Sequence, residues 1–187
     1  IDILTAESVA LLKEMISIES PSFSEEAVCS HISGWLSDKG VVHERIGNNI
    51  IAGHVIDEAR PTLMLCAHID TVKPSEDYSF NPYTPDYKTA AEVVSRITGR
   101  SLNEEDVVAG LGSNDDGASV VSMIATFRHF TERFLDSYFR LTRNDNTIAP
   151  SSLSSDTSVI SNKVETSADL LLVLSCEEER SGLNGMT

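Results

Sequence analysis

A short apolar run that ends in a histidine and an aspartate constrains the fold of this chain more than any other feature. Residues 63–67 are Leu-Met-Leu-Cys-Ala, and His68 and Asp70 follow. Runs of this length are typical of strands buried on both faces, and in open α/β sheets ligands bind just outside the carboxyl ends of such strands. Asp70 shares one side of an extended segment with His68, so it can hold one imidazole nitrogen and leave the other for a metal. The alternative is a core histidine followed by a turn aspartate.

Two later stretches also place acidic residues after an apolar run. Residues 107–119 pass from a short apolar run into a glycine-punctuated turn with Asp115 and Asp116, and a helical pattern follows. Residues 170–176 form another apolar run, and three glutamates occupy positions 177–179. We therefore expect three strands that end in His/Asp, Asp/Asp and Glu/Glu/Glu. Imidazole with several carboxylates suits zinc, cobalt or manganese, and a carboxylate beside the metal can serve as a general base.

Each of these acidic stretches also has a simpler interpretation. The glycines at 110, 112 and 117 could form a phosphate loop, but no lysine follows them and Asp115 and Asp116 would repel phosphate. The three glutamates could be a solvated acidic run. The metal-site interpretation is favoured because the three stretches occur together in one chain.

These stretches resemble a known family. AHIDTV, GLGSNDDGAS and SCEEERSGLNG occur in the order typical of the di-zinc aminoacylase and acetylornithine deacetylase metallohydrolases, which include succinyl-diaminopimelate desuccinylases and glutamate carboxypeptidases. LTAESVALLKEMISIESPSFSEE is similar to the family's N-terminal helix. The resemblance implies an α/β fold, a three-layer sandwich with a mixed, mainly parallel sheet and helices on both faces.

The resemblance also implies a role for each candidate residue. His68, Asp115 and Glu179 would bind two Zn²⁺ ions, with Asp115 bridging them and Co²⁺ or Mn²⁺ as alternative metals. Asp70 would orient His68. Glu178 would be the general base, which takes a proton from the attacking water and passes it to the leaving nitrogen. The reaction implied is metal-dependent amide hydrolysis that removes an acetyl or succinyl group from an N-acylated amino acid such as acetylornithine.

Two other functions stay open at this point. A dipeptidase or carboxypeptidase would use the same residues, and a non-catalytic α/β module would keep the fold for binding or assembly. In the family, a further aspartate ligand, a histidine ligand and a smaller lid and dimerisation domain come later in the chain. We therefore expect residues 1–187 to be the N-terminal, incomplete part of a catalytic domain, weak in metal binding and low in activity. A homodimer is expected only if the whole protein carries the second domain.

Composition narrows the choice of partners and compartment. The formal charge of −15 would repel nucleic acid and anionic membranes, which favours a small-molecule substrate. The sequence shows no apolar stretch of the roughly 20 residues that span a bilayer and no signal-peptide pattern, so the cytoplasm is the expected compartment. The three cysteines are expected to be reduced, buried thiols; they are Cys29, Cys66 and Cys176.

Periodicity predicts the remaining elements. Helices are expected over residues 5–18, from residue 24 to Gly40, and after the acidic turn, with a hairpin around residues 47–49. Residues 89–97 have helical character within a stretch that otherwise shows no clear pattern. Residues 142–167 are rich in serine, threonine, asparagine and aspartate, which is typical of an exposed insertion.

Overall fold

A computed structural model describes residues 2–54, 59–76, 78, 80–144 and 168–182. In chain order its elements are α1 (Asp2–Ile16), α2 (Glu26–Asp38), β1 (Glu44–Ile46), β2 (Asn49–His54), β3 (Thr62–His68), α3 (Tyr87–Thr98), η1 (Glu104–Asp106), α4 (Gly117–Asn144), β4 (Asp169–Ser175) and η3 (Glu178–Arg180). The predicted insertion at residues 142–167 begins within the end of α4, and residues 145–167 lie outside the described part of the chain.

The four described strands form one mixed sheet in the order β1-β2-β4-β3. β3 pairs with β4 in parallel, whereas β1 with β2 and β2 with β4 are antiparallel. The α/β class and the mixed sheet are confirmed. Parallel pairing has a smaller share among these strands than expected. The hairpin at Gly47, which has a φ of 62°, sets β2 antiparallel to β1, and β2 also runs antiparallel to β4.

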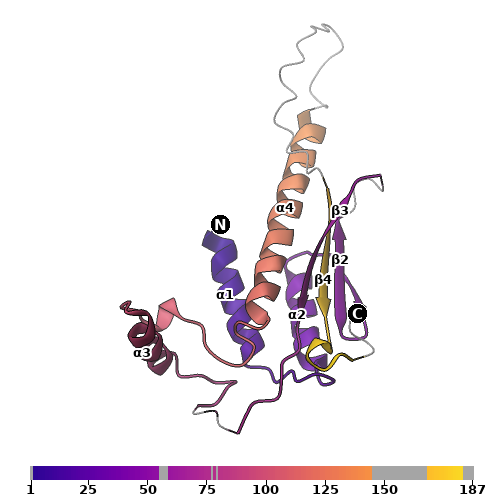
Figure 1. Ribbon diagram of the computed structural model, residues 1–187. Helices are drawn as coiled ribbons and strands as arrows, with labels where there is room; N and C mark the ends of the chain where they lie inside the picture. The colour runs from indigo at the N-terminus through magenta and orange to yellow at the C-terminus, as the bar shows by residue number, and fades with distance from the viewer. Residues whose placement is uncertain (1, 55–58, 77, 79, 145–167, 183–187) are drawn as a thin grey trace, which may run out of the picture.

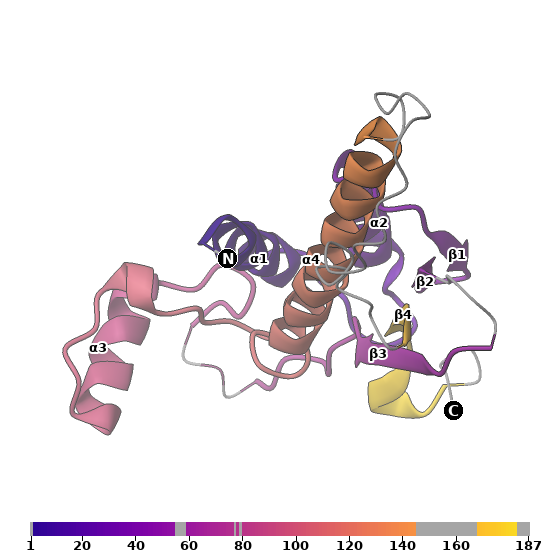
Figure 2. The ribbon, with the colours of Figure 1, turned by 90° about the horizontal axis from the view of Figure 1, so that it is seen from above.

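Three helices, α1, α2 and α4, lie on one side of this sheet (Figures 1 and 2). Their apolar stripes pack on alternate residues of the strands, and the largest fully buried apolar side chains are Leu11, Ile32, Leu36, Ile50, Ile124, Leu172 and Leu174. The described helices therefore form a layer on one face. On the opposite face Met64 and Cys66 of β3 are exposed, so a second helical layer is not formed by the described residues.

The helix predictions are confirmed, with α4 extending 28 residues. α3 confirms the helical character of residues 89–97: the Asp86 carboxylate accepts hydrogen bonds from its first turn, and Gly99 ends it in the left-handed region. α3 lies apart from the sheet, packed with η1 (Figure 2). None of the helices in the described ranges combines the length and apolar character needed to cross a membrane.

Two predictions about strands are wrong. β3 is not buried on both faces: as the last described strand of the sheet it leaves Leu63 53% and Met64 51% exposed. Residues 107–111 do not form a strand. Gly110 and Gly112, with φ values of 126° and 75°, turn the backbone away from the extended conformation before a strand ladder can form.

Truncation of a central leucine should cost far more stability than truncation of an edge leucine. Leu172 is fully buried in β4, so Leu172→Ala should lower the free energy of unfolding by about 2–5 kcal/mol. Leu63→Ala, at the half-exposed edge, should lower it by about 1 kcal/mol or less. Urea titration of both variants checks this, and equal losses would contradict the described burial.

Candidate metal centre

The Asp70 carboxylate joins three segments of the chain at the end of β3. It is 1% exposed and accepts hydrogen bonds from Ser22 Oγ at 2.7 Å, from Glu178 N at 3.1 Å and from Glu179 N at 3.1 Å. Its Oδ1 also lies 3.3 Å from His68 Nδ1. Burial raises the pKa of this carboxyl, but the bonds from His68, Ser22 and the two backbone amides outweigh burial and hold the pKa below its ordinary value of 3.8.

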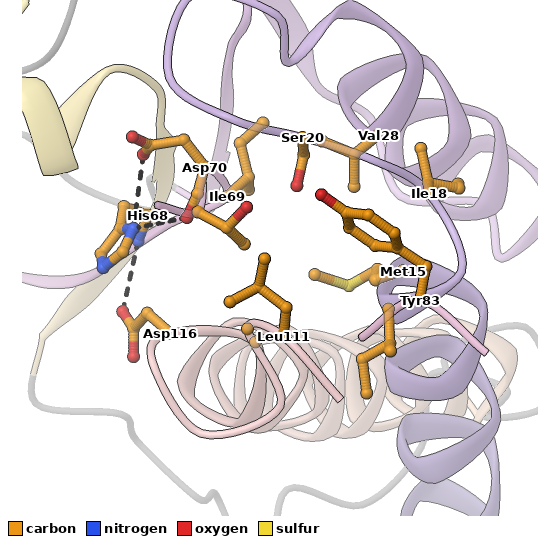
Figure 3. A pocket seen from close by; sticks show the side chains of 14 residues that line it. Met15, Ile18, Ser20, Val28, His68, Ile69, Asp70, Tyr83, Leu111 and Asp116 are labelled. Carbon is orange, nitrogen blue, oxygen red and sulfur yellow. Dashed lines mark hydrogen bonds and ion pairs between the residues drawn. The ribbon is translucent and has the colours of Figure 1, made fainter. Parts of the chain in front are cut away.

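His68 is held by carboxylates on both sides of its ring. Its Nε2 lies 3.1 Å from Asp115 Oδ1 and 3.7 Å from Glu178 Oε2, and its backbone N donates to Asp116 Oδ2 at 3.3 Å. Figure 3 shows the imidazole between Asp70 and Asp116. The bond to Asp70 and the nearby carboxylates outweigh burial and raise the pKa of His68 to about 9. The ring therefore holds a proton more tightly than an isolated imidazole does, and it must release that proton before it can bind a metal.

The glutamate run sits on a sharp turn after β4. Glu177 is buried and has a φ of 58°, and the short helix η3 begins at Glu178. Burial, together with the charges of Asp115 and Glu178, raises the pKa of Glu179. Carboxylates held this close repel one another, so a bound cation would relieve the repulsion.

The acidic turn reaches the site through tightly packed glycines. A Cβ on Gly117 would lie 2.5 Å from the carbonyl oxygen of Gly112 and 2.7 Å from the Leu12 side chain. Gly117 also donates its N–H to that Gly112 carbonyl at 2.9 Å. A larger residue would push the turn away from α1 and displace Asp115 with it.

The structure brings together the three predicted metal ligands, which come from three separate segments. One ligand atom from each of His68, Asp115 and Glu179 lies within 4.8 Å of the others, and within the described ranges this is the group of histidine, cysteine or acidic side chains placed to hold a metal. Nitrogen and carboxylate oxygen donors of this kind fit zinc, cobalt or manganese. Glu178, the predicted base, lies beside the group with a side chain that is 59% exposed.

Sequence reasoning missed several residues that hold the site. Ser22 and Asp116 bind Asp70 and His68 as described above, Glu25 accepts from Glu177 N at 3.1 Å, and Asn49 Oδ1 accepts from Cys176 N at 3.0 Å. One signal was present for Glu25. It stands three residues before Val28, in line with the apolar stripe of α2, where an acidic residue requires buried partners.

A small cavity lies behind His68, lined by Met15, Ser20, Asp70, Tyr83 and Leu111 among others (Figure 3). Its volume is about 20 Å³, which is room for a water molecule and far too little for a substrate. Burial raises the pKa of the Tyr83 hydroxyl at this cavity. The ligand group is therefore open to solvent on its other side, where the exposed side chains of Asp115 and Glu178 lie.

The cysteine prediction is correct for two residues of three. Cys29 and Cys176 are buried, whereas Cys66 is exposed on the face of β3 that the described helices do not cover. Burial, with added repulsion from Glu25 and Glu177, raises the pKa of Cys176 to about 11. Burial also raises the pKa of Cys29.

Thiol labelling should therefore distinguish the three cysteines. At pH 8 the folded chain should take up one maleimide or iodoacetamide adduct, at Cys66, because the buried thiols are protonated and shielded. In denaturant all three should react. Peptide mass spectrometry reads both results, and rapid labelling of Cys176 in the folded chain would contradict its described burial.

Asp70→Asn should destabilise the chain by about 1–3 kcal/mol, because the amide NH₂ replaces an acceptor in a set of hydrogen-bond donors. The matched control is Asp38→Asn at the exposed end of α2, which should change the unfolding free energy by no more than about 0.5 kcal/mol. Urea unfolding measures both. Equal stabilities for the two variants would show that Asp70 does not hold the three segments together.

Comparison with known proteins supports the fold. No family model matches the chain. It is 28% identical over 150 residues to a probable carboxypeptidase of Arthroderma gypseum, an alignment that covers 72% of this chain and 30% of that protein.

Among solved structures, a dinuclear metal-binding peptidase of the M20 family from Bacillus subtilis aligns with a TM-score of 0.51 and 13% identity, covering 96% of this chain and 37% of that one. A di-peptidase of Saccharomyces cerevisiae aligns with a TM-score of 0.50 and 15% identity, covering 98% and 34%. The chain thus spans about a third of the length of these proteins, and its described α/β fold is similar to part of the fold of the two solved structures.

Proposed function

We propose that this chain contributes the metal site of a metal-dependent hydrolase that cleaves the peptide bond of a small peptide, as a dipeptidase or carboxypeptidase does. The observation that carries the proposal is the convergence of His68, Asp115 and Glu179 to within 4.8 Å, with Glu178 exposed beside them. Support comes from the similar proteins, which are described as a probable carboxypeptidase, a dinuclear metal-binding peptidase and a di-peptidase.

His68, Asp115 and Glu179 would hold the metal, and we propose two Zn²⁺ ions with Asp115 shared between them. A divalent cation supplies Lewis acidity there, since it polarises an amide carbonyl and makes nearby water more acidic. The donor set fits this use, because one imidazole and two carboxylates leave room for water and substrate. A centre of two ions would need protein ligands in addition to these three.

The chain's own residues supply orientation and proton transfer. Asp70 keeps the His68 ring in place through Nδ1, so that Nε2 faces Asp115. The exposed Glu178 carboxylate would accept a proton from the attacking water and deliver it to the leaving nitrogen. Asp70 also binds the backbone N–H of Glu178, so the residue that orients the imidazole also positions the base.

A second candidate is removal of an acetyl or succinyl group from an N-acylated amino acid. The stretches GLGSNDDGAS and CEEERSG, which are similar to those of acetylornithine deacetylases, favour it. Both reactions hydrolyse an amide with the same residues. They differ in the acyl side of the amide bond: it is an amino-acid residue in a peptide, and an acetyl or succinyl group in an N-acylated amino acid.

Cobalt titration with matched glutamate variants tests the proposal. The unaltered chain should bind Co²⁺, and Glu179→Ala should weaken binding by at least about tenfold because a ligand is lost. Glu178→Gln should bind Co²⁺ as the unaltered chain does. With enzyme in excess over substrate and Co²⁺ present, slow hydrolysis of a dipeptide panel should fall by about 10²–10⁴-fold in Glu178→Gln.

N-acetylornithine in the same assay separates the two candidates. Faster cleavage of dipeptides supports the peptidase, and faster cleavage of N-acetylornithine supports the deacylase. The metal site would be refuted if the unaltered chain bound no Co²⁺, or if Glu179→Ala bound Co²⁺ as tightly as the unaltered chain does.

A further inference from the structure

Glu25 is a buried carboxylate that the proposed chemistry does not use. It is 0% exposed and stands at the N-cap of α2, yet its side chain makes no capping bond to that helix. A buried charge is costly unless it is fully hydrogen-bonded. Its partners therefore indicate what it does.

Those partners link three segments that are distant in sequence. Glu25 Oε1 accepts hydrogen bonds from Phe23 N at 2.7 Å and from Glu177 N at 3.1 Å, and Oε2 accepts one from Asn48 Nδ2 at 3.3 Å. Phe23 and Glu177 are both in the left-handed region, with φ values of 72° and 58°. One carboxylate oxygen thus binds the N–H groups of two residues whose backbone conformations are unfavourable for any side chain.

Glu177 is also the first residue of the turn that carries the base and a ligand. Side chains from other segments accept the N–H of four successive residues in this turn: Asn49 at Cys176, Glu25 at Glu177, and Asp70 at Glu178 and Glu179. Asn49 is the first residue of β2, and Asp70 lies two residues after the end of β3. Glu25 is the N-cap residue of α2, and it binds the N–H of Glu177, the residue of this set in the left-handed region.

We infer that Glu25 is a positioning residue, which fixes the left-handed turn at Glu177 and thereby directs Glu178 and Glu179 to the site. Its function depends on accepting backbone hydrogen bonds and not on its charge. Glutamine retains an acceptor oxygen for Phe23 N and Glu177 N and gives up only the longer contact with Asn48 Nδ2, whereas alanine retains no acceptor. The role rests on the proposed function only in its catalytic consequence, since the turn itself can be observed without metal.

Two readouts on the full chain test this inference, with Glu25→Gln, Glu25→Ala and Glu26→Ala compared. Glu26 is the exposed neighbour, with a side chain 72% exposed. In Glu25→Ala, hydrogen exchange of the Glu177, Glu178 and Glu179 amides should accelerate by at least about tenfold relative to amides in the first turns of α4. Co²⁺ affinity should fall by about tenfold or more as the ligand loses its fixed position. Glu25→Gln and Glu26→Ala should resemble the unaltered chain in both.

Leu36→Ala provides a control for general destabilisation, because Leu36 is fully buried in α2 away from the turn. It should lower stability without selective exchange at residues 177–179. Equal exchange changes in Leu36→Ala and Glu25→Ala would overturn the inference, as would loss of protection in Glu25→Gln equal to that in Glu25→Ala. If the unaltered chain binds no Co²⁺, the proposed function fails, and the exchange measurement still decides the positioning role.

Discussion

The interaction on which the rest of the site depends is the set of hydrogen bonds accepted by the Asp70 carboxylate. This buried anion accepts hydrogen bonds from Ser22, in the loop before α2, and from two amides of the glutamate turn. It also lies at ion-pair distance from His68 Nδ1, which makes a hydrogen bond to the backbone carbonyl of Asp70. Because these donors are fixed in separate segments, the carboxylate is fully satisfied only when all of them are in place. The turn and the imidazole are therefore held by the same side chain.

Glu25 performs the same task one residue earlier in the turn. Both residues are buried acids that accept backbone hydrogens and contribute no ligand atom to the group of His68, Asp115 and Glu179. The site is thus built in two layers of carboxylates. The outer layer faces solvent and carries the proposed ligand atoms, while the inner layer stabilises backbone conformations that would otherwise be unfavourable.

Much of this arrangement was predictable from the sequence, and the rest was not for identifiable reasons. The apolar run before His68 and the one before Glu177 predicted strands β3 and β4, whose parallel pairing places both ends at one edge of the sheet. Periodicity also located α1, α2 and α4. It could not show that residues 107–111 lack a strand partner, because pairing depends on distant segments. The roles of Ser22 and Asn49 were hidden for the same reason, whereas the place of Glu25 in line with the apolar stripe of α2 was a signal in the sequence.

The exposed edge of β3 has a consequence for how the chain behaves in solution. Leu63 and Met64 present apolar surface at the last described strand, and such an edge is a template for adding another strand from a neighbouring molecule. The net charge of −15 opposes that approach through mutual repulsion, which dissolved salt weakens. Self-association of the chain thus depends on the balance between the exposed apolar edge of β3, which favours it, and the repulsion between negatively charged molecules, which opposes it. Low ionic strength should therefore favour separate molecules.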